Sequence, residues 1–175
     1  AFASAAEGTA SFAGQLVATD VDLNSTLSYF ATNPSPVAGF TLNPNGSYSF
    51  DPANAAYDRL TAGQVLPISI GYTVIDGQGG SASSTLTITL TGTNDVPVIS
   101  GATAGDRAVT EETDLTASGT LSIIDADAGQ SEFAPVTTGT TLYGTYTLSA
   151  AGAWTYNLNN SNATVQALAA GAPLS

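Results

Sequence analysis

The sequence repeats itself, and this internal repeat constrains the fold more than any other feature. Two stretches match residue by residue at an offset of 105 to 108 positions, so the chain holds one and a half copies of one pattern. Self-similarity at a fixed spacing indicates repeated structural units, so we expect two units of the same fold. The matched pairs are Glu7 with Glu112, Gly14 with Gly119, Leu16 with Leu121, Asp20 with Asp125, Asp22 with Asp127, Gly46 with Gly152, Tyr48 with Trp154 and Leu60 with Leu168.

The second copy ends before the pattern is complete. Residues 168–171 match 60–63, and nothing after them corresponds to 67–91. The second unit is therefore expected to be incomplete at its C-terminus. The Ala-rich start lacks the basic region of a signal peptide, so we expect the chain to be a segment of a larger protein.

Alternation of apolar and polar residues predicts β-strands. Apolar residues alternate over 68–74 and 86–90 and on both sides of the 43–46 turn, which is the period of a half-buried strand. Asn-Gly at 45–46 and the Asp-Gly-rich segment 76–80 predict tight hairpin turns, and Asp76 is interpreted as a turn former. Short helical turns are expected only near 54–60 and 162–170, the second ended by Gly171.

These patterns predict an all-β protein. Short strands with frequent turn signals in units of about 100 residues are typical of tandem immunoglobulin-like β-sandwiches. The expected organisation is one sandwich over 1–93, a linker over 94–97, and a second, truncated sandwich over 98–175.

Charge and composition exclude several function classes. The chain of 175 residues has 14 acidic and 2 basic side chains, a net charge of −12, and no His or Cys. Nucleic acids and anionic lipids are bound mainly through Lys and Arg clusters, so neither is an expected partner. Without imidazole or thiolate, zinc, haem, iron–sulfur and Ser-His-Asp chemistry are excluded. No stretch reaches the roughly 18 apolar residues of a membrane span, so membrane insertion is not expected.

Repeated carboxylates suggest a cation site. Asp20 and Asp22 recur as Asp125 and Asp127, and alternation at a strand end would place both carboxylates on one side of the backbone. Calcium takes 6 to 8 oxygen ligands at about 2.3–2.6 Å and tolerates irregular geometry, which magnesium does not. We therefore predict calcium as the cofactor. Solvated surface acids that keep the module soluble are the alternative interpretation.

Several motifs together resemble one family of extracellular repeats. The chain is similar to the VCBS and cadherin-like repeats of bacterial type I-secreted (RTX-type) adhesins, including rhizobial adhering proteins. The resemblance covers nearly the whole chain. The residues that carry it are Glu7, Asp20 and Asp22, Tyr57 to Leu60, Gly92 to Pro97, and Gly119 to Gln130.

The resemblance implies a calcium site at the junction of the two modules. Its ligands would be Glu7, Asp58, Asn94, Asp95, Asp125 and Asp127. Asp20 and Asp22 would be half of another junction, which involves a preceding module. Gly92 and Leu60 stand where the family carries acids, so fewer or weaker ions than three are expected.

The resulting hypothesis is a calcium-stabilised module of a secreted or bacterial cell-surface adhesin that acts in attachment or biofilm cohesion. Neighbouring repeats of the same chain are the expected partners, and calcium would rigidify the module junction. Alternatively, the modules are calcium-dependent lectins that bind an acidic exopolysaccharide or capsule directly. Enzymatic activity is not expected, although paired acids also occur in glycosidases.

Two further expectations concern the second module. Tyr48, Trp154, Tyr146 and Tyr156 could form a sugar-stacking platform, but their alternation and repeat matching favour core positions. The missing counterparts of 67–91 would leave core and edge uncovered. We expect a neighbouring molecule to cover the edge by strand addition, which would cause self-association. Alternatively, the second module is partly ordered and much less stable than the first.

Overall fold

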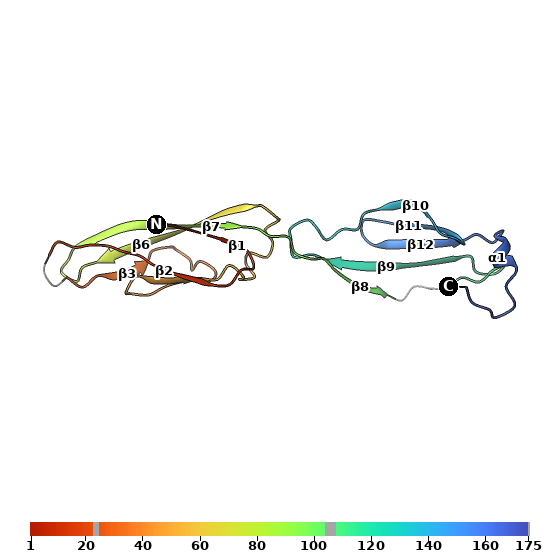
Figure 1. The fold of residues 1–175 in the computed structure, drawn as a ribbon, viewed down its shortest axis with the longest axis horizontal. Coiled ribbons are helices and arrows are strands. Elements are labelled where there is room, and N and C mark those ends of the chain that lie inside the picture. Colours follow the sequence, from red (N-terminus) through yellow and green to blue (C-terminus); the bar gives the residue numbers. More distant parts are fainter. Residues whose placement is uncertain (23–24, 104–107, 175) are drawn as a thin grey trace. The chain divides into compact units, whose positions relative to one another are not determined.

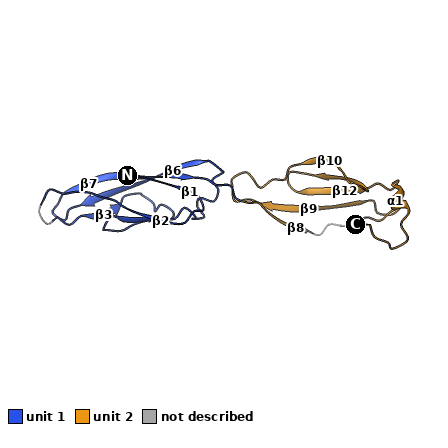
Figure 2. Cartoon of the chain, viewed as in Figure 1, with its two compact units in different colours: residues 1–95 blue, residues 96–175 orange. Residues whose placement is uncertain are grey.

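The computed structural model describes residues 1–22, 25–103 and 108–174, which form two compact units (Figure 1). Unit 1 spans Ala1–Asp95 and unit 2 spans Val96–Ser175 (Figure 2). Nearly all regular structure is β-strand, which confirms the all-β prediction. Ser175, the last residue of the predicted second module, lies outside the described residues.

Unit 1 is a sandwich of two sheets. Its strands are β1 (Phe2–Ala6), β2 (Phe12–Gln15), β3 (Ser28–Ala31), β4 (Phe40–Leu42), β5 (Ser47–Phe50), β6 (Val65–Ile75) and β7 (Ser81–Thr91). One sheet has the order β1-β7-β6-β3 and the other has the order β2-β5-β4. All neighbouring strands are antiparallel except β1 and β7, which are parallel.

The β6–β7 hairpin forms the centre of the larger sheet. The two strands pair without a register shift from Val65↔Thr91 to Ile75↔Ser81. The predicted alternation is confirmed over 68–74 and 86–90, where the inward side chains are buried and the outward residues are Ser, Thr and Gly. The buried set is Ile68, Ile70, Tyr72, Val74, Leu86, Ile88 and Leu90.

The core of unit 1 lies between its two sheets. One hydrophobic cluster joins the inward residues of β6 and β7 to Tyr48 and Phe50 of the smaller sheet and to Leu16, which directly follows β2. Phe50 is fully buried, and its ring centroid lies 5.8 Å from that of Phe12 and 5.6 Å from that of Tyr57. Aromatic contacts of this kind add to the area buried, so this cluster is a major source of the unit's stability.

The described residues of unit 2 form a five-stranded antiparallel sheet with the order β10-β11-β12-β9-β8. Its elements are β8 (Val98–Thr103), β9 (Thr116–Ile124), β10 (Val136–Thr140), β11 (Gly144–Leu148), β12 (Ala153–Leu158) and α1 (Ala163–Gln166). The α1 turn is capped by Asn162, whose side chain accepts hydrogen bonds from the Thr164 and Val165 backbone N–H groups.

Three strands of unit 2 repeat the smaller sheet of unit 1. Strands β9, β12 and β11 take the places of β2, β5 and β4, with Trp154 opposite Gly119 as Tyr48 is opposite Gly14. Strand β10 occupies the position in the second repeat that β3 occupies in the first. It pairs with β11, whereas β3 pairs with β6. The described part of unit 2 contains no counterpart of β6 and β7, in agreement with the predicted incompleteness.

Two sequence-based expectations need correction. Residues 54–60 form successive turns and no helix, closed by hydrogen bonds from Tyr57 N–H to Asn54 C=O and from Leu60 N–H to Tyr57 C=O. The aromatic residues of the second copy are not core residues, because no second sheet covers them within the described part of unit 2. Tyr146 keeps 37% of its surface exposed, and Trp154 and Tyr156 are half-buried, whereas Tyr48 is buried as predicted.

Candidate functional site

Glu7 lies at the end of β1, where unit 1 meets the residues that follow β7. Its carboxylate Oε2 accepts a hydrogen bond of 3.1 Å from the Thr93 backbone N–H. The Glu7 backbone N–H donates to the Thr91 carbonyl at 2.9 Å, which extends the β1–β7 pairing. Only 5% of Glu7 is exposed. The predicted ligand is therefore a buried carboxylate fixed beside the start of the linker, and Thr93 is a contact that sequence reasoning missed.

Asp58 lies in the turns of 51–60 between two buried neighbours. Tyr57 is buried and its hydroxyl donates to the Ala38 carbonyl at 2.7 Å, while Leu60 is also part of the core. Burial raises the pKa of the Tyr57 hydroxyl. The resemblance implies an acid at position 60, and the side chain found there is the buried, apolar Leu60, which carries no carboxylate.

Gly92 is the other departure from the family pattern, and its surroundings leave no room for a side chain. A Cβ at this position would lie 2.3 Å from the Thr61 carbonyl oxygen and 2.7 Å from that of Leu60. Backbone hydrogen bonds hold the turn in place, from Gly92 N–H to Gln64 C=O and from Gly63 N–H to Gly92 C=O. An acid at position 92 would therefore have to displace the 60–64 turn.

The predicted linker ligands follow Gly92 in a segment without regular structure. Asn94 is exposed, and its side-chain amide donates to the Asp95 carbonyl. Asp95 is half-buried. Both side chains carry oxygen atoms, as calcium requires.

The two Asp-x-Asp segments adopt the same local structure. The Asp20 carboxylate accepts from the Asp22 backbone N–H at 2.7 Å, and the Asp125 carboxylate accepts from the Asp127 backbone N–H at 2.9 Å. Each pair is thus an Asx turn after the strand, not the extended continuation that the sequence suggested. Asp20 and Asp22 are exposed, whereas Asp127 is 1% exposed, so the two repeats differ in the burial of the second carboxylate.

Asp20 also shares a depression of about 170 Å³ in unit 1 with Asp76. Asp76 Oδ1 accepts hydrogen bonds from the N–H groups of Gln78, Gly79 and Gly80 at 2.7–3.0 Å. The bond from Gln78 contributes most to holding the pKa of Asp76 below its ordinary value. The carboxylate closes the β6–β7 turn, as the sequence predicted.

The donor set as a whole fits a hard cation. Within the described ranges no three carboxylates form a group that could hold a metal ion, so the predicted ligand set stays a prediction. Glu7 and Asp127 are both buried, and the chain has only 2 basic residues. Buried carboxylates require a cation or hydrogen bonds, and oxygen ligands of this type suit calcium.

Glu112, the repeat partner of Glu7, makes a different set of contacts. Its carboxylate Oε1 accepts from the side-chain amides of Asn160 at 3.1 Å and of Gln166 at 2.9 Å. These two bonds, that from Gln166 first, hold the pKa of Glu112 below its ordinary value. Gln166 occupies the repeat position of Asp58, so the sequence did carry a signal for this contact.

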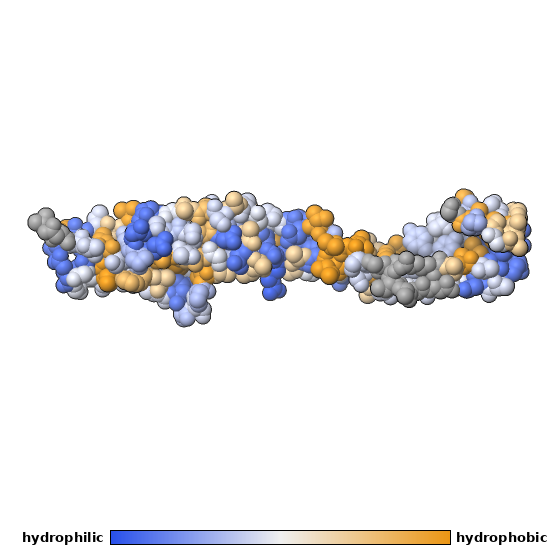
Figure 3. Space-filling model, turned by 90° about the horizontal axis from the view of Figure 1, so that it is seen from below, coloured by the Kyte–Doolittle hydropathy of each residue, from blue (hydrophilic) through white to orange (hydrophobic). Residues whose placement is uncertain are grey.

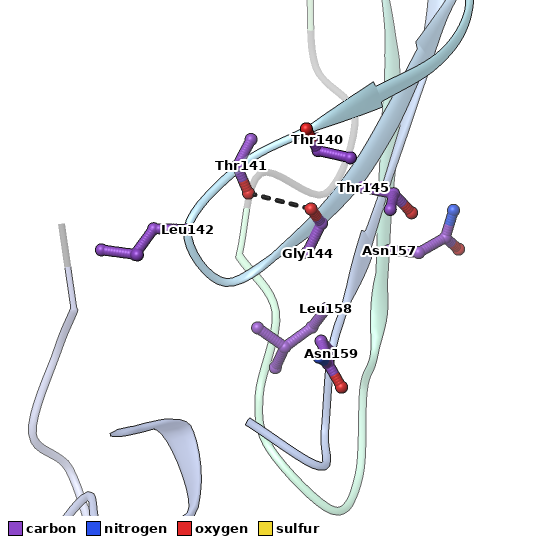
Figure 4. A pocket seen from close by; sticks show the side chains of 8 residues that line it. All are labelled: Thr140, Thr141, Leu142, Gly144, Thr145, Asn157, Leu158 and Asn159. Atoms are coloured by element: carbon purple, nitrogen blue, oxygen red, sulfur yellow. Dashed lines mark hydrogen bonds between the residues drawn. The ribbon is translucent and has the colours of Figure 1, made fainter. Parts of the chain in front are cut away.

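Two depressions in the described part of unit 2 have no carboxylate in their lining. One of about 360 Å³ lies at the loop between β10 and β11 and is lined mainly by Thr, Asn and Leu (Figure 4). Thr141 Oγ1 donates to the Gly144 carbonyl at 3.2 Å within this loop.

The family model described as "Bacterial cadherin-like domain" matches residues 1–92. No curated protein sequence matches the chain. No helix in the described ranges is long and apolar enough to cross a membrane.

Solved cadherin structures are similar to the chain in fold. The structure titled PcdhgB3 EC1-4 is 15% identical with a TM-score of 0.57, and the match covers 95% of this chain and 40% of that one. Protocadherin Gamma B2 extracellular cadherin domains 1-5 is 16% identical with a TM-score of 0.54, covering 90% of this chain and 31% of that one. The chain thus spans less than half of these structures, and the likeness confirms the predicted cadherin-like, immunoglobulin-type fold.

Proposed function

Since the chain belongs to the bacterial cadherin-like domain family, we propose that it is a calcium-binding tandem module of a bacterial extracellular adhesin. It acts in attachment or biofilm cohesion, at the cell surface or in secreted form. Neighbouring repeats are its partners, and the finer resemblance to VCBS repeats of type I-secreted adhesins belongs to the same proposal.

The buried carboxylate of Glu7 is the observation that carries this proposal. It lies at the end of unit 1 and is bonded to Thr93, directly before the linker residues Asn94 and Asp95. Carboxylate oxygens are ligands of the type that calcium takes in proteins. Calcium bound beside Glu7 would add positive charge to a chain whose net charge is −12.

The residues that would hold calcium are the carboxylates and the amide of the junction. These are Glu7, Asp58, Asn94, Asp95, Asp125 and Asp127. Bound calcium would supply positive charge and oxygen coordination, and it would offset the mutual repulsion of five carboxylates. Because ligands from both units would share the ion, the junction would sample fewer angles with calcium than without it. Asp20 and Asp22 would serve a preceding module.

Thermal unfolding with and without calcium tests the proposal. An ion that binds only the folded state stabilises it by about 2.7 kcal/mol at one hundred times Kd. Extracellular calcium modules often have Kd of about 10⁻⁴–10⁻³ M, so millimolar calcium should raise Tm and micromolar calcium should not. Magnesium at the same concentration is the control. An unchanged Tm in millimolar calcium after chelation would count against the proposal.

Paired Asp→Asn variants locate the site. Asn keeps the Asx turn but removes the charge, so Asp125→Asn with Asp127→Asn should abolish the calcium-dependent rise in Tm and broaden the small-angle scattering distribution. Asp20→Asn with Asp22→Asn changes the same turn in unit 1 and is the matched control, with a smaller effect. Equal effects of the two double variants would place the ion elsewhere.

A calcium-dependent lectin is the second candidate function. The observation in its favour is the scarcity of basic residues, because an anionic glycan would then need the metal as its positive partner. Binding of an acidic polysaccharide should be measured in calcium and again after chelation. Binding that is lost on chelation supports this candidate, whereas binding that survives chelation excludes metal bridging.

A further inference from the structure

One end of unit 2 is held together by side-chain amides. Strand β9 begins at Thr116 and its antiparallel neighbour β12 ends at Leu158. The residues before β9 and after β12 therefore lie at the same end of the sheet, which is the end that carries α1 (Figure 1). Three polar residues from these segments bond to one another there. We call them the amide clamp, and they are Glu112, Asn160 and Gln166.

Four hydrogen bonds join the amide clamp. Glu112 Oε1 accepts from Asn160 Nδ2 at 3.1 Å and from Gln166 Nε2 at 2.9 Å. Gln166 Nε2 also donates to the Asn160 carbonyl at 2.7 Å, and the Glu112 backbone N–H donates to Asn160 Oδ1 at 3.0 Å. Each of the three residues therefore bonds to both of the others.

The amide clamp lies at the surface. At the end of unit 2 that carries α1, hydrophilic side chains lie beside hydrophobic ones (Figure 3). Glu112 and Gln166 are exposed, and Asn160 is half-buried. The carboxylate of Glu112 accepts from residues 48 and 54 positions away, so the clamp fastens the segment before β9 to the segment after β12 and to α1.

The partners of each amide fix which of its ends faces the carboxylate. Gln166 Nε2 lies between two acceptors, and a flipped amide would place an oxygen against both of them. The Asn160 amide is fixed in the same way, because its Oδ1 accepts from a backbone N–H. Calcium requires oxygen ligands, whereas both amides direct N–H groups at the Glu112 carboxylate. The amide clamp therefore does not fit a calcium ion.

The corresponding segment of unit 1 has the same local structure. Both segments contain an Asx turn, closed by Asn54 in unit 1 and by Asn162 in unit 2. In both, the third residue after the turn-forming Asn is buried, Tyr57 in unit 1 and Val165 in unit 2. The backbone thus supports the residue equivalence that the repeat gives.

The side chains at the clamp positions differ between the units. The equivalent pairs are Glu112 with Glu7, Asn160 with Pro52, and Gln166 with Asp58. Neither a proline nor an ionised aspartate has a side-chain N–H, so neither can donate to the carboxylate as the two amides do. Both donors of the amide clamp are therefore specific to unit 2.

We propose that the amide clamp takes the place of a calcium ion at this end of unit 2, so that Glu112 is a structural carboxylate and not a metal ligand. The contrast with Glu7 rests on the proposed function, whereas the clamp itself does not. Chelation of calcium should loosen the chain at Glu7 and leave the segment before β9 fastened to α1.

Variants of Gln166 in the full chain test the clamp, with urea unfolding of unit 2 followed by the emission of Trp154, the single tryptophan. In EDTA, Gln166→Ala should lower the midpoint by about 0.3–1 M, because two hydrogen bonds are lost. Gln166→Glu should lower it further, because a second carboxylate would face Glu112. The loss caused by Gln166→Ala should be the same in millimolar calcium. Thr164→Ala changes an exposed residue of α1 and is the matched control, with little effect expected.

Nuclear magnetic resonance of the unaltered chain locates calcium relative to the clamp. The side-chain amide signals of Asn160 and Gln166 should stay in place when calcium is raised from micromolar to millimolar. The backbone N–H of Thr93 donates to Glu7, so its signal should shift in the same titration if the proposed function holds.

Three outcomes would overturn the proposal. A loss on Gln166→Ala that appears in calcium but not in EDTA would make Gln166 a metal ligand. Saturable calcium shifts of the Asn160 and Gln166 amide signals would place the ion at the clamp. A midpoint of Gln166→Glu in EDTA no lower than that of Gln166→Ala would show that residue 166 does not face Glu112. Failure of the proposed function looks different, because the Thr93 signal would then stay unshifted while the Gln166 variants kept their effects in EDTA.

Discussion

Glu112 shows how one repeated residue acquires two roles. Its repeat partner Glu7 accepts a backbone N–H and is buried, whereas Glu112 is exposed and is held by the amides of Asn160 and Gln166. Glu112 has a φ of 65°, which residues other than glycine rarely adopt. Its backbone N–H donates a hydrogen bond to Asn160 Oδ1. Hydrogen bonds at the backbone N–H and at the side-chain carboxylate of Glu112 thus hold the strained backbone in place.

The contacts of Glu112 predict a pH-dependent contribution to the stability of unit 2. A carboxyl whose folded-state pKa lies below its ordinary value of 4.5 stabilises the fold above that value, and the contribution is lost as pH falls through the folded-state pKa. Glu112→Gln should therefore lower the unfolding midpoint at pH 7 but have little effect near about pH 2.5. The measurement is denaturant unfolding followed by Trp154 emission, and Glu111→Gln is the control. A Glu112→Gln effect that is equal at both pH values would contradict the assignment.

In both units, a glycine on one strand lies beneath an aromatic ring on the neighbouring strand. A Cβ on Gly14 would lie 2.4 Å from the Tyr48 ring, and one on Gly119 would lie 2.9 Å from the Trp154 ring. Each pair is directly opposite across neighbouring strands. Such pairing covers the backbone that glycine leaves bare. This cross-strand contact explains why glycine and aromatic residues persist together in the repeat.

The two glycines should respond differently to alanine. Neither has a positive φ, so Gly→Ala would ordinarily stabilise the strand by about 0.4–1 kcal/mol. Gly14→Ala should instead destabilise unit 1 by about 1–3 kcal/mol, because Tyr48 is buried against Phe40 and cannot move. Gly119→Ala should cost less, because the half-buried Trp154 ring can shift. Urea unfolding measures both, with Ser118→Ala on the opposite face of β9 as control. Equal destabilisation by Gly14→Ala and Gly119→Ala would show that burial of the aromatic ring does not determine the effect of the substitution.

Strands with strong alternation were predictable from sequence, and strands that depend on distant partners were not. The 68–74 and 86–90 patterns identify β6 and β7 because one face of each strand is buried over these residues. Strand β10 could not be placed in the same way, since it pairs with β11 where β3 pairs with β6. The prediction that Trp154 is a core residue was wrong for a related reason. Alternation identifies which side chains share a face of a strand but not what covers that face.

The candidate site was predictable to a similar degree. The repeated carboxylates and the Asp76 turn could be read directly, because their spacing reflects local backbone hydrogen bonds. The contact of Glu7 with Thr93 could not, since the two residues are far apart in sequence and meet only through the β1–β7 pairing.

The two units have very unequal cores. Every member of the large hydrophobic cluster belongs to unit 1, whereas Ala117 and Val165 are the buried hydrophobic residues in the described part of unit 2. Fully burying a large aliphatic or aromatic side chain contributes about 1.5–3 kcal/mol. Small domains have only about 5–15 kcal/mol of net stability, so a deficit of several such residues is a large fraction of the total.

Unit 2 should therefore unfold before unit 1. Trp154 is the sole tryptophan and reports unit 2 alone, while far-UV circular dichroism reports both units. In urea, the Trp154 emission should change at a lower midpoint than the second half of the dichroism signal, because fewer buried apolar groups oppose unfolding of unit 2. Ile88→Ala should lower only the later transition, by about 2–5 kcal/mol, since Ile88 is fully buried in unit 1. Val165→Ala should lower only the earlier one. Coincident transitions for both probes, shifted together by either substitution, would show that the two cores unfold as one cooperative structure.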